Sequence, residues 1–245
     1  MKICLSSTLI IIFAIKLFAQ ANIGTFDKDR DTWVVNTQKI KCEFIEGAMF
    51  PTSFQKGNNY YPNFSLLDEL ITPSGKYYLK EERWAKHKIL KNSPEIFQIS
   101  CQGKFGINKS ARYQIYKDSD AIYTYTFYKN SSLVSLSCQI FITGKIPVKY
   151  HILHPGWLYQ NFDKIIIKNK IIKPLRGKNI AIPSTGAILQ SSIGSVKILQ
   201  KANFNTSYKR YDKNSNLFQH LSFENHQGEL KGTGKITTQI NLEFN

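Results

Sequence analysis

Two short stretches of the chain gather side chains that could bind a charged ligand and move a proton. The first is Glu81–His87, in which Arg83 and His87 stand four residues apart and share a face if the segment is helical. The Arg83 guanidinium could pair a carboxylate while the His87 imidazole transfers a proton, with Trp84 beside them as a packing surface. The alternative is a solvated, salt-bridged surface with Trp84 in the core.

The second stretch is Lys149–Tyr159, the densest grouping of titratable and aromatic side chains in the sequence. Its candidate residues are Tyr150, His151, His154, Trp157 and Tyr159. In an extended strand His151 lies on one face and Tyr150 and His154 on the other, and residues 154–156 read as a turn that presents the two later aromatics. Aromatic rings with a few hydrogen-bonding groups suit sugar recognition, although ordinary core packing is the competing interpretation.

Many familiar chemical motifs are missing from the sequence. It has no Gly-x-Ser-x-Gly elbow, Gly-rich phosphate loop, His-Glu-x-x-His or EF-hand spacing, and no Cys-x-x-Cys pair. We therefore predict no cofactor and no metal site. The basic and aromatic residues from 117 to 129 could face single-stranded nucleic acid, but they serve equally well as cross-strand pairs, so no dedicated nucleic-acid motif is present.

The elements that would position these residues are β-strands throughout. Alternating apolar and polar residues, rich in aromatic and β-branched types, predict a three-stranded antiparallel meander over 111–116, 122–128 and 133–142. We expect the face carrying Tyr125 and Phe127 to be buried. Residues 33–35 and 39–45 are predicted to form an opening strand pair or one long bent strand. Further strands are predicted at 164–172, 187–199 with a break at Gly194, 217–223 and 235–244. The only plausible helical piece is 80–91.

The first 21 residues have the pattern of a secretory signal peptide. A positive start at Lys2, an apolar stretch from Leu9 to Phe13 and the small-x-small sequence ending at Ala21 predict export, and Lys16 interrupts the run before it could span a membrane. No later segment resembles a transmembrane span. We therefore expect a secreted, periplasmic or extracellular protein with one β-sandwich domain over 22–245.

Charge and cysteine content describe the exported chain further. The 245 residues carry a net charge of +16, and removal of two leader lysines leaves +14. Such a field attracts anionic glycans, nucleic acid or envelope surfaces, although the basic residues are mostly Lys, which favours a diffuse field over bidentate recognition. Cys42, Cys101 and Cys138 allow one disulfide in any of three pairings, and Cys101 and Cys138 sit in alternating runs that predict inward-facing side chains.

The opening strand that ends Gly47–Pro51, the Pro73–Tyr78 segment and the strand-rich run 111–142 together resemble the β-sandwich portions of secreted polysaccharide lyases. The similarity is to exo-rhamnogalacturonan-lyase-like proteins and, more broadly, to the galactose-mutarotase-like sandwich superfamily. The resemblance implies an all-β, antiparallel supersandwich with little helix. It also implies a ligand lying across a concave sheet face lined by His151, His154, Trp157, Arg83 and His87.

The resulting expectation is a carbohydrate-binding or carbohydrate-processing protein for an acidic, uronate-containing polysaccharide. If it is an enzyme, it is polysaccharide lyase-like, with His151, His154 and Arg83 catalytic and Trp157, Tyr159, Trp84, His87 and Tyr150 in substrate binding. The lyases of this type also carry an α/α toroid that this chain lacks, which favours a binding module. The alternatives are a non-catalytic envelope or interaction protein with a compositionally basic surface, and a binder of extracellular nucleic acid or another anionic surface.

Overall fold

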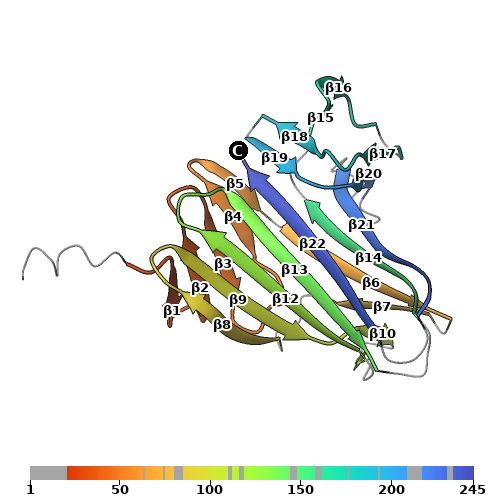
Figure 1. Ribbon diagram of the computed structural model, residues 1–245, viewed down its shortest axis with the longest axis horizontal. Helices are drawn as coiled ribbons and strands as arrows, with labels where there is room; N and C mark the ends of the chain where they lie inside the picture. Colours follow the sequence, from red (N-terminus) through yellow and green to blue (C-terminus); the bar gives the residue numbers. More distant parts are fainter. Residues whose placement is uncertain are drawn as a thin grey trace, which may run out of the picture.

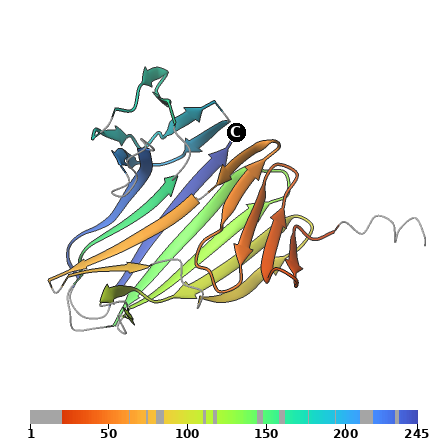
Figure 2. The ribbon, with the colours of Figure 1, turned by 180° about the vertical axis from the view of Figure 1, so that it is seen from behind.

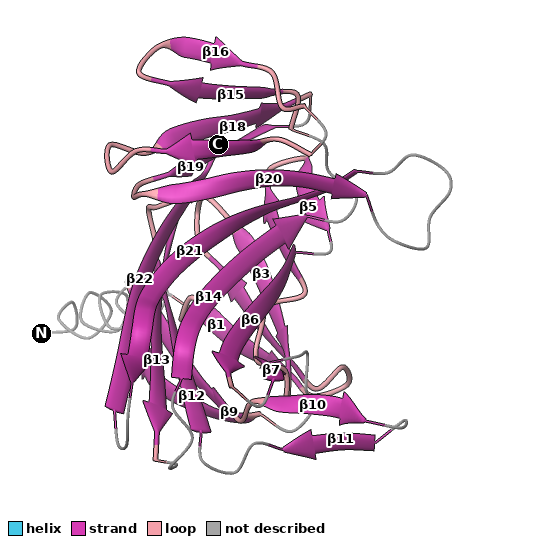
Figure 3. Ribbon diagram, turned by 90° about the vertical axis from the view of Figure 1, so that its right-hand side faces the viewer, coloured by secondary structure: helices cyan, strands magenta, loops and turns pink. Residues whose placement is uncertain are grey.

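The computed structural model describes residues 21–62, 64–73, 75–79, 85–109, 112–115, 119–143, 148–157, 162–175, 177–192, 194–208, 217–230 and 234–245. Within these ranges every regular element is a β-strand, and the strands form three antiparallel sheets (Figures 1 and 3). The predicted all-β antiparallel sandwich is confirmed. No helix in the described part of the chain is long and apolar enough to cross a membrane.

The first sheet has five strands that follow one another in chain order. They are β1 (Gly24–Asp27), β2 (Thr32–Asn36), β3 (Lys41–Ile45), β4 (Ser53–Lys56) and β5 (Asn59–Pro62). The segments predicted at 33–35 and 39–45 are thus an antiparallel pair and not one bent strand, because the chain reverses over residues 37–40.

The second sheet has eight strands and joins distant parts of the sequence. In spatial order they are β11 (Arg112–Ile115), β10 (Gly106–Lys109), β7 (Gly75–Leu79), β6 (Phe64–Thr72), β14 (Val148–Trp157), β21 (Leu217–Leu230), β20 (Ala202–Tyr208) and β17 (Asn179–Ile182).

The third sheet has nine strands. In spatial order they are β16 (Lys170–Ile172), β15 (Lys164–Ile167), β18 (Ala187–Ser191), β19 (Gly194–Ile198), β22 (Gly234–Phe244), β13 (Leu133–Ile142), β12 (Ser119–Tyr128), β9 (Ile96–Gly103) and β8 (Lys86–Asn92).

Three sequence-based expectations about these elements are corrected. The predicted meander is only a hairpin of β12 and β13, since β11 pairs with β10 in another sheet and β12 takes β9 as its second partner. The proposed helix over 80–91 is a strand from Lys86 onward, where consecutive residues pair with β9. Residues 80–84 lie outside the described ranges. The predicted strand 164–172 is a hairpin that turns at Lys168 and Asn169, both with positive φ.

One continuous core lies on a single face of the nine-stranded sheet. Tyr123, Tyr125 and Phe127 are buried on alternate positions of β12, as predicted. In Figures 1 and 2 the five-stranded sheet and the middle of the eight-stranded sheet cover this same side. The Phe44 ring meets Tyr125 edge-on at 5.0 Å between centroids, and Phe54 stacks on Phe244 at 4.6 Å.

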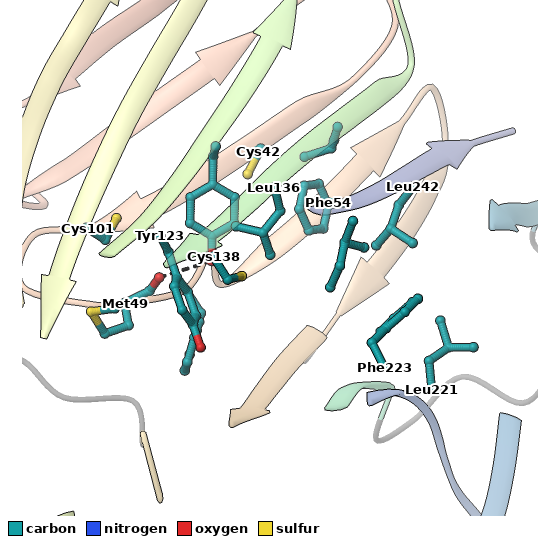
Figure 4. Close-up of a cluster of buried hydrophobic side chains, with 14 of the residues drawn as sticks. Cys42, Met49, Phe54, Cys101, Tyr123, Leu136, Cys138, Leu221, Phe223 and Leu242 are labelled. Atoms are coloured by element: carbon teal, nitrogen blue, oxygen red, sulfur yellow. Dashed lines mark hydrogen bonds between the residues drawn. The ribbon is translucent and has the colours of Figure 1, made fainter. Parts of the chain in front are cut away.

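The eight-stranded sheet contributes Leu221 and Phe223 to the same cluster, near Leu242 and Leu136 (Figure 4). Each buried Phe or Leu side chain removed from water stabilises the fold by about 1.5–3 kcal/mol, so this shared layer holds the three sheets together. The face of the eight-stranded sheet with Leu70, Leu221 and Phe223 is called its core face below, and the opposite face its outer face.

Candidate functional site

His87 is fixed inside the protein between two sheets. On β8 it is the register partner of Cys101, and its side chain is only 2% exposed. Its Nδ1 lies 3.1 Å from Glu46 Oε2 and its Nε2 lies 2.6 Å from the Ala48 carbonyl oxygen. Both ring nitrogens therefore have a hydrogen-bond partner on the β3–β4 connection. In this structure His87 ties the β3–β4 connection to the edge of the nine-stranded sheet.

The other described candidates lie on β14, near the middle of the eight-stranded sheet, while Arg83, Trp84 and Tyr159 lie outside the described residues. The expected turn at 154–156 is wrong: β14 continues unbroken to Trp157 because Pro155 and Gly156 keep register with Leu66 and Ser65 of β6. The candidates on β14 therefore lie on one continuous, central strand.

The register separates the β14 candidates onto two faces. His151 is the partner of Leu70, which is fully buried, and Trp157 is the partner of Gln219, whose side-chain amide bonds the backbone of the buried Phe162. His151 and Trp157 therefore share the core face. His154 and Tyr150 share the outer face, because side chains alternate along a strand. His87 lies in a different sheet from all four.

Strand β21 brings in residues that the sequence reasoning did not select. His226 is the register partner of His151, and His220 is the partner of Gly156. Four of the five histidines of the chain thus lie on two adjacent strands. A β-bulge between the His151 and Ile152 pairs shifts the register of β21 by one residue, which places His226 on the core face. The predicted strand 217–223 ends where this bulge interrupts the alternation.

The outer face of β6, β14 and β21 carries a polar group that we call the central outer cluster, defined as Glu69, His154, His220 and Glu224. Glu69 and Glu224 flank Ile152 from the two sides, and His220 is opposite Gly156. In the register, His154 on β14 stands diagonally from Glu69 on β6 and from His220 and Glu224 on β21, and diagonal positions of a sheet are about 7–8 Å apart at Cα.

One described residue in the middle of the outer face is buried. Ser222, which lies on this face between His220 and Glu224, is only 6% exposed. Toward the edges of the same face Lys76 on β7 and Asn179 on β17 are exposed. Imidazole and carboxyl groups accept and donate protons and hydrogen-bond hydroxyl groups, so these residue types suit a hydroxyl-rich ligand.

No group of three metal-ligating side chains occurs among the residues whose side chains the structure describes, and Cys42, Cys101 and Cys138 are buried free thiols there. The inward position predicted for Cys101 and Cys138 is confirmed.

Solved structures with the same fold are galactose mutarotase-like proteins. A galactose mutarotase related enzyme from Lactobacillus acidophilus aligns with a TM-score of 0.56 at 11% identity, over 87% of this chain and 97% of its own. A putative aldose 1-epimerase from Escherichia coli K12 also gives 0.56, at 9% identity over 87% and 98%. A putative mutarotase from Salmonella typhimurium gives 0.52, at 10% identity over 95% and 100%.

The fold is therefore that of the galactose-mutarotase-like sandwiches, as the resemblance implied. No protein-family model and no curated protein sequence matches the chain.

Proposed function

We propose that this protein binds a carbohydrate on the outer face of the eight-stranded sheet and, if it is an enzyme, processes the carbohydrate there. The observation that carries the proposal is the register of β6, β14 and β21, which gathers the central outer cluster on one face. The fold adds support, since proteins named as mutarotase and aldose epimerase share it over nearly their whole length.

The ligand class that fits the whole molecule is an acidic, uronate-containing glycan. The net charge of +16 attracts polyanions from solution. A glycan of this kind is also the expected partner of a protein exported to the periplasm or the cell exterior, as the leader sequence predicts. Binding to the central outer cluster would use hydroxyl hydrogen bonds, while the surrounding lysine field would favour the carboxylates.

Titration of the purified protein with oligogalacturonate and with a neutral oligosaccharide of equal length tests the proposal. We expect saturable binding of the acidic chain that weakens as salt rises, because exposed charges are screened beyond about 8 Å at physiological ionic strength. His154→Ala should weaken binding about tenfold, as loss of a hydrogen bond to a charged group does. The matched control is Asn179→Ala, which alters the exposed edge of the same face.

The same titration separates binding from catalysis. A uronate lyase takes the proton α to the carboxylate and leaves an unsaturated uronate, whose ultraviolet absorbance then grows with time. In that case activity should collapse in His154→Ala and Arg83→Ala while the fold persists. Binding without this absorbance and without new reducing ends assigns the protein as a binding module. Equal binding by wild type and His154→Ala would contradict the site.

A further inference from the structure

A groove on the five-stranded sheet is formed by other strands than those of the central outer cluster. Its lining is typical of a site for a small anion. It has a volume of about 260 Å³ and is lined by Asn36, Gln38, Lys39, Lys41, Gln55 and Gly57. A smaller hollow of about 110 Å³ adjoins it and shares Lys41 and Gln55. Drug-sized ligands occupy roughly 300–1,000 Å³, so this groove matches one sugar ring and not a long chain segment.

The floor of the groove is a rigid turn between β2 and β3. The Thr37 hydroxyl accepts hydrogen bonds from the backbone N–H of Lys39 at 3.1 Å and of Ile40 at 2.8 Å. The Gln38 N–H donates to the Lys129 carbonyl at 2.8 Å, which ties the turn to the β12–β13 hairpin. Because these bonds fix the backbone, binding here costs little ordering of the protein.

The rim of the groove supplies cations and amides. On β3 and β4, Lys41 and Gln55 are register partners, and the Gln55 amide nitrogen donates to the Gly57 carbonyl at 3.0 Å. Lys41 Nζ lies 3.1 Å from Glu43 Oε1, at a position where Lys41 is 43% exposed. Such an exposed ion pair contributes only about 0–1 kcal/mol, so the ammonium remains able to take another anion.

Arg30 adds a further cation on the Glu43 side. Its Nη1 lies 3.5 Å from Glu43 Oε1 and its Nε donates to Asp27 Oδ2 at 2.7 Å. The side-chain hydrogen bond from Arg30 holds the pKa of Asp27 below its ordinary value and raises that of Arg30. The acidic groups at this end are thus already paired with cations, while Lys39 is exposed at the other end of the groove.

We propose that this groove binds a single carboxylated sugar ring, with Lys41 and Lys39 facing its carboxylate and the Asn36, Gln38 and Gln55 amides facing its hydroxyls. This deepens the proposed function, because it supplies a uronate-selective subsite on a sheet separate from the central outer cluster.

Amide chemical-shift titration of the ¹⁵N-labelled protein with free galacturonic acid tests the groove by itself. We expect saturable shifts confined to residues 36–41 and 55–57, about tenfold weaker binding in Lys41→Gln, and no such shifts with galactose or acetate. Lys170→Gln removes the same charge from an exposed position on another sheet and should change the affinity by less than about twofold.

Three results would overturn the proposed uronate site in the groove. Galacturonic acid binding could be weakened equally by Lys41→Gln and Lys170→Gln, or its chemical-shift changes could spread over the whole basic surface. Equal chemical-shift changes with acetate would indicate a site for any small anion. If Lys41→Gln instead leaves oligogalacturonate binding intact while His154→Ala abolishes it, the groove fails and the proposed function stands.

Discussion

Tyr125 is a buried aromatic residue whose hydroxyl makes a polar contact within the apolar core. Its side chain is 1% exposed, and its hydroxyl donates to the Met49 carbonyl at 3.1 Å, joining β12 to the β3–β4 connection. The sequence predicts that this face of β12 is buried, but it cannot predict the acceptor. Met49 is 76 residues away and precedes a strand in another sheet.

Replacing Tyr125 by Phe should therefore lower the free energy of unfolding by about 1–3 kcal/mol, since it leaves the Met49 carbonyl without its donor in the core. Urea denaturation of the variant measures this. The control is Tyr128→Phe on the same strand, where the side chain is 41% exposed and the change should stay within about 0.5 kcal/mol. Equal stability of the two variants would show that the hydroxyl contributes nothing.

The buried thiols predict how stability depends on pH. Burial raises the pKa of Cys42 and of Cys101 above the ordinary value of 9.0, and it raises that of Tyr125 above 10.0. The folded protein keeps protons that the unfolded chain releases. The stabilisation is therefore complete below pH 9 and is lost as pH rises above it.

Each of these two thiols should make the free energy of unfolding fall by roughly 1 kcal/mol per pH unit once the unfolded thiol ionises. Denaturation curves between pH 7 and 10.5 measure the slope, and Cys101→Ala should make it shallower by about that amount. A constant free energy of unfolding through pH 10 would contradict the burial of these thiols.

At the scale of elements, the connections decide which sequence predictions succeed. Strands β12, β13 and β22 follow unbroken alternation, so the sequence predicts their extent closely. The alternation of apolar and polar residues misleads where the chain passes from one sheet to another, as it does between β11 and β12. It also misleads where a bulge breaks the alternation, as in β21. For the same reason His220 and His226 are not selected from sequence, because their proximity to β14 is a product of long-range pairing.

The edge strand β8 depends on His87, which links it to the N-terminal sheet. His87→Ala should cost about 2–3 kcal/mol in the free energy of unfolding, because the Ala48 carbonyl and the Glu46 carboxylate both lose a hydrogen-bond partner and a buried side chain is removed. Lys88→Ala, at the neighbouring exposed position, should be close to neutral. Chemical denaturation compares the two variants. If the free energy of unfolding of His87→Ala equals that of the wild type, the imidazole is not needed for stability and a ligand role for it is restored.

The turn that leads into β18 depends on a glycine. Gly186 has a φ of +83°, and a Cβ at this position would clash with the Ile198 carbonyl oxygen on the paired strand. Gly57 also has a positive φ, of +55°, but faces open space. From backbone conformation alone, Gly57→Ala should lower the free energy of unfolding by about 1–2 kcal/mol. Gly186→Ala should lower it clearly more, because the added Cβ also clashes. Thermal unfolding of both variants gives the difference, and equal melting temperatures would contradict the packing at β18–β19.

At the scale of the whole molecule, three sheets share one core and leave two polar surfaces for a ligand. The central outer cluster lies on the eight-stranded sheet and the lysine-lined groove on the five-stranded sheet. Both suit hydroxyl-rich ligands, and the net charge of +16 favours acidic ones. The fold is shared with mutarotase-like proteins, but the residues that would select a substrate are local to each chain, which is why the substrate must be measured.

A glycan-array screen with the purified protein tests whether it selects uronate-containing glycans. We expect retention on a discrete set of these glycans, stronger at low salt, with weaker retention on neutral glycans of the same length. Retention that follows only the charge density of the probe, with sulfated polymers and nucleic acid bound as well as uronates, would contradict it. So would the absence of any retained glycan at low salt.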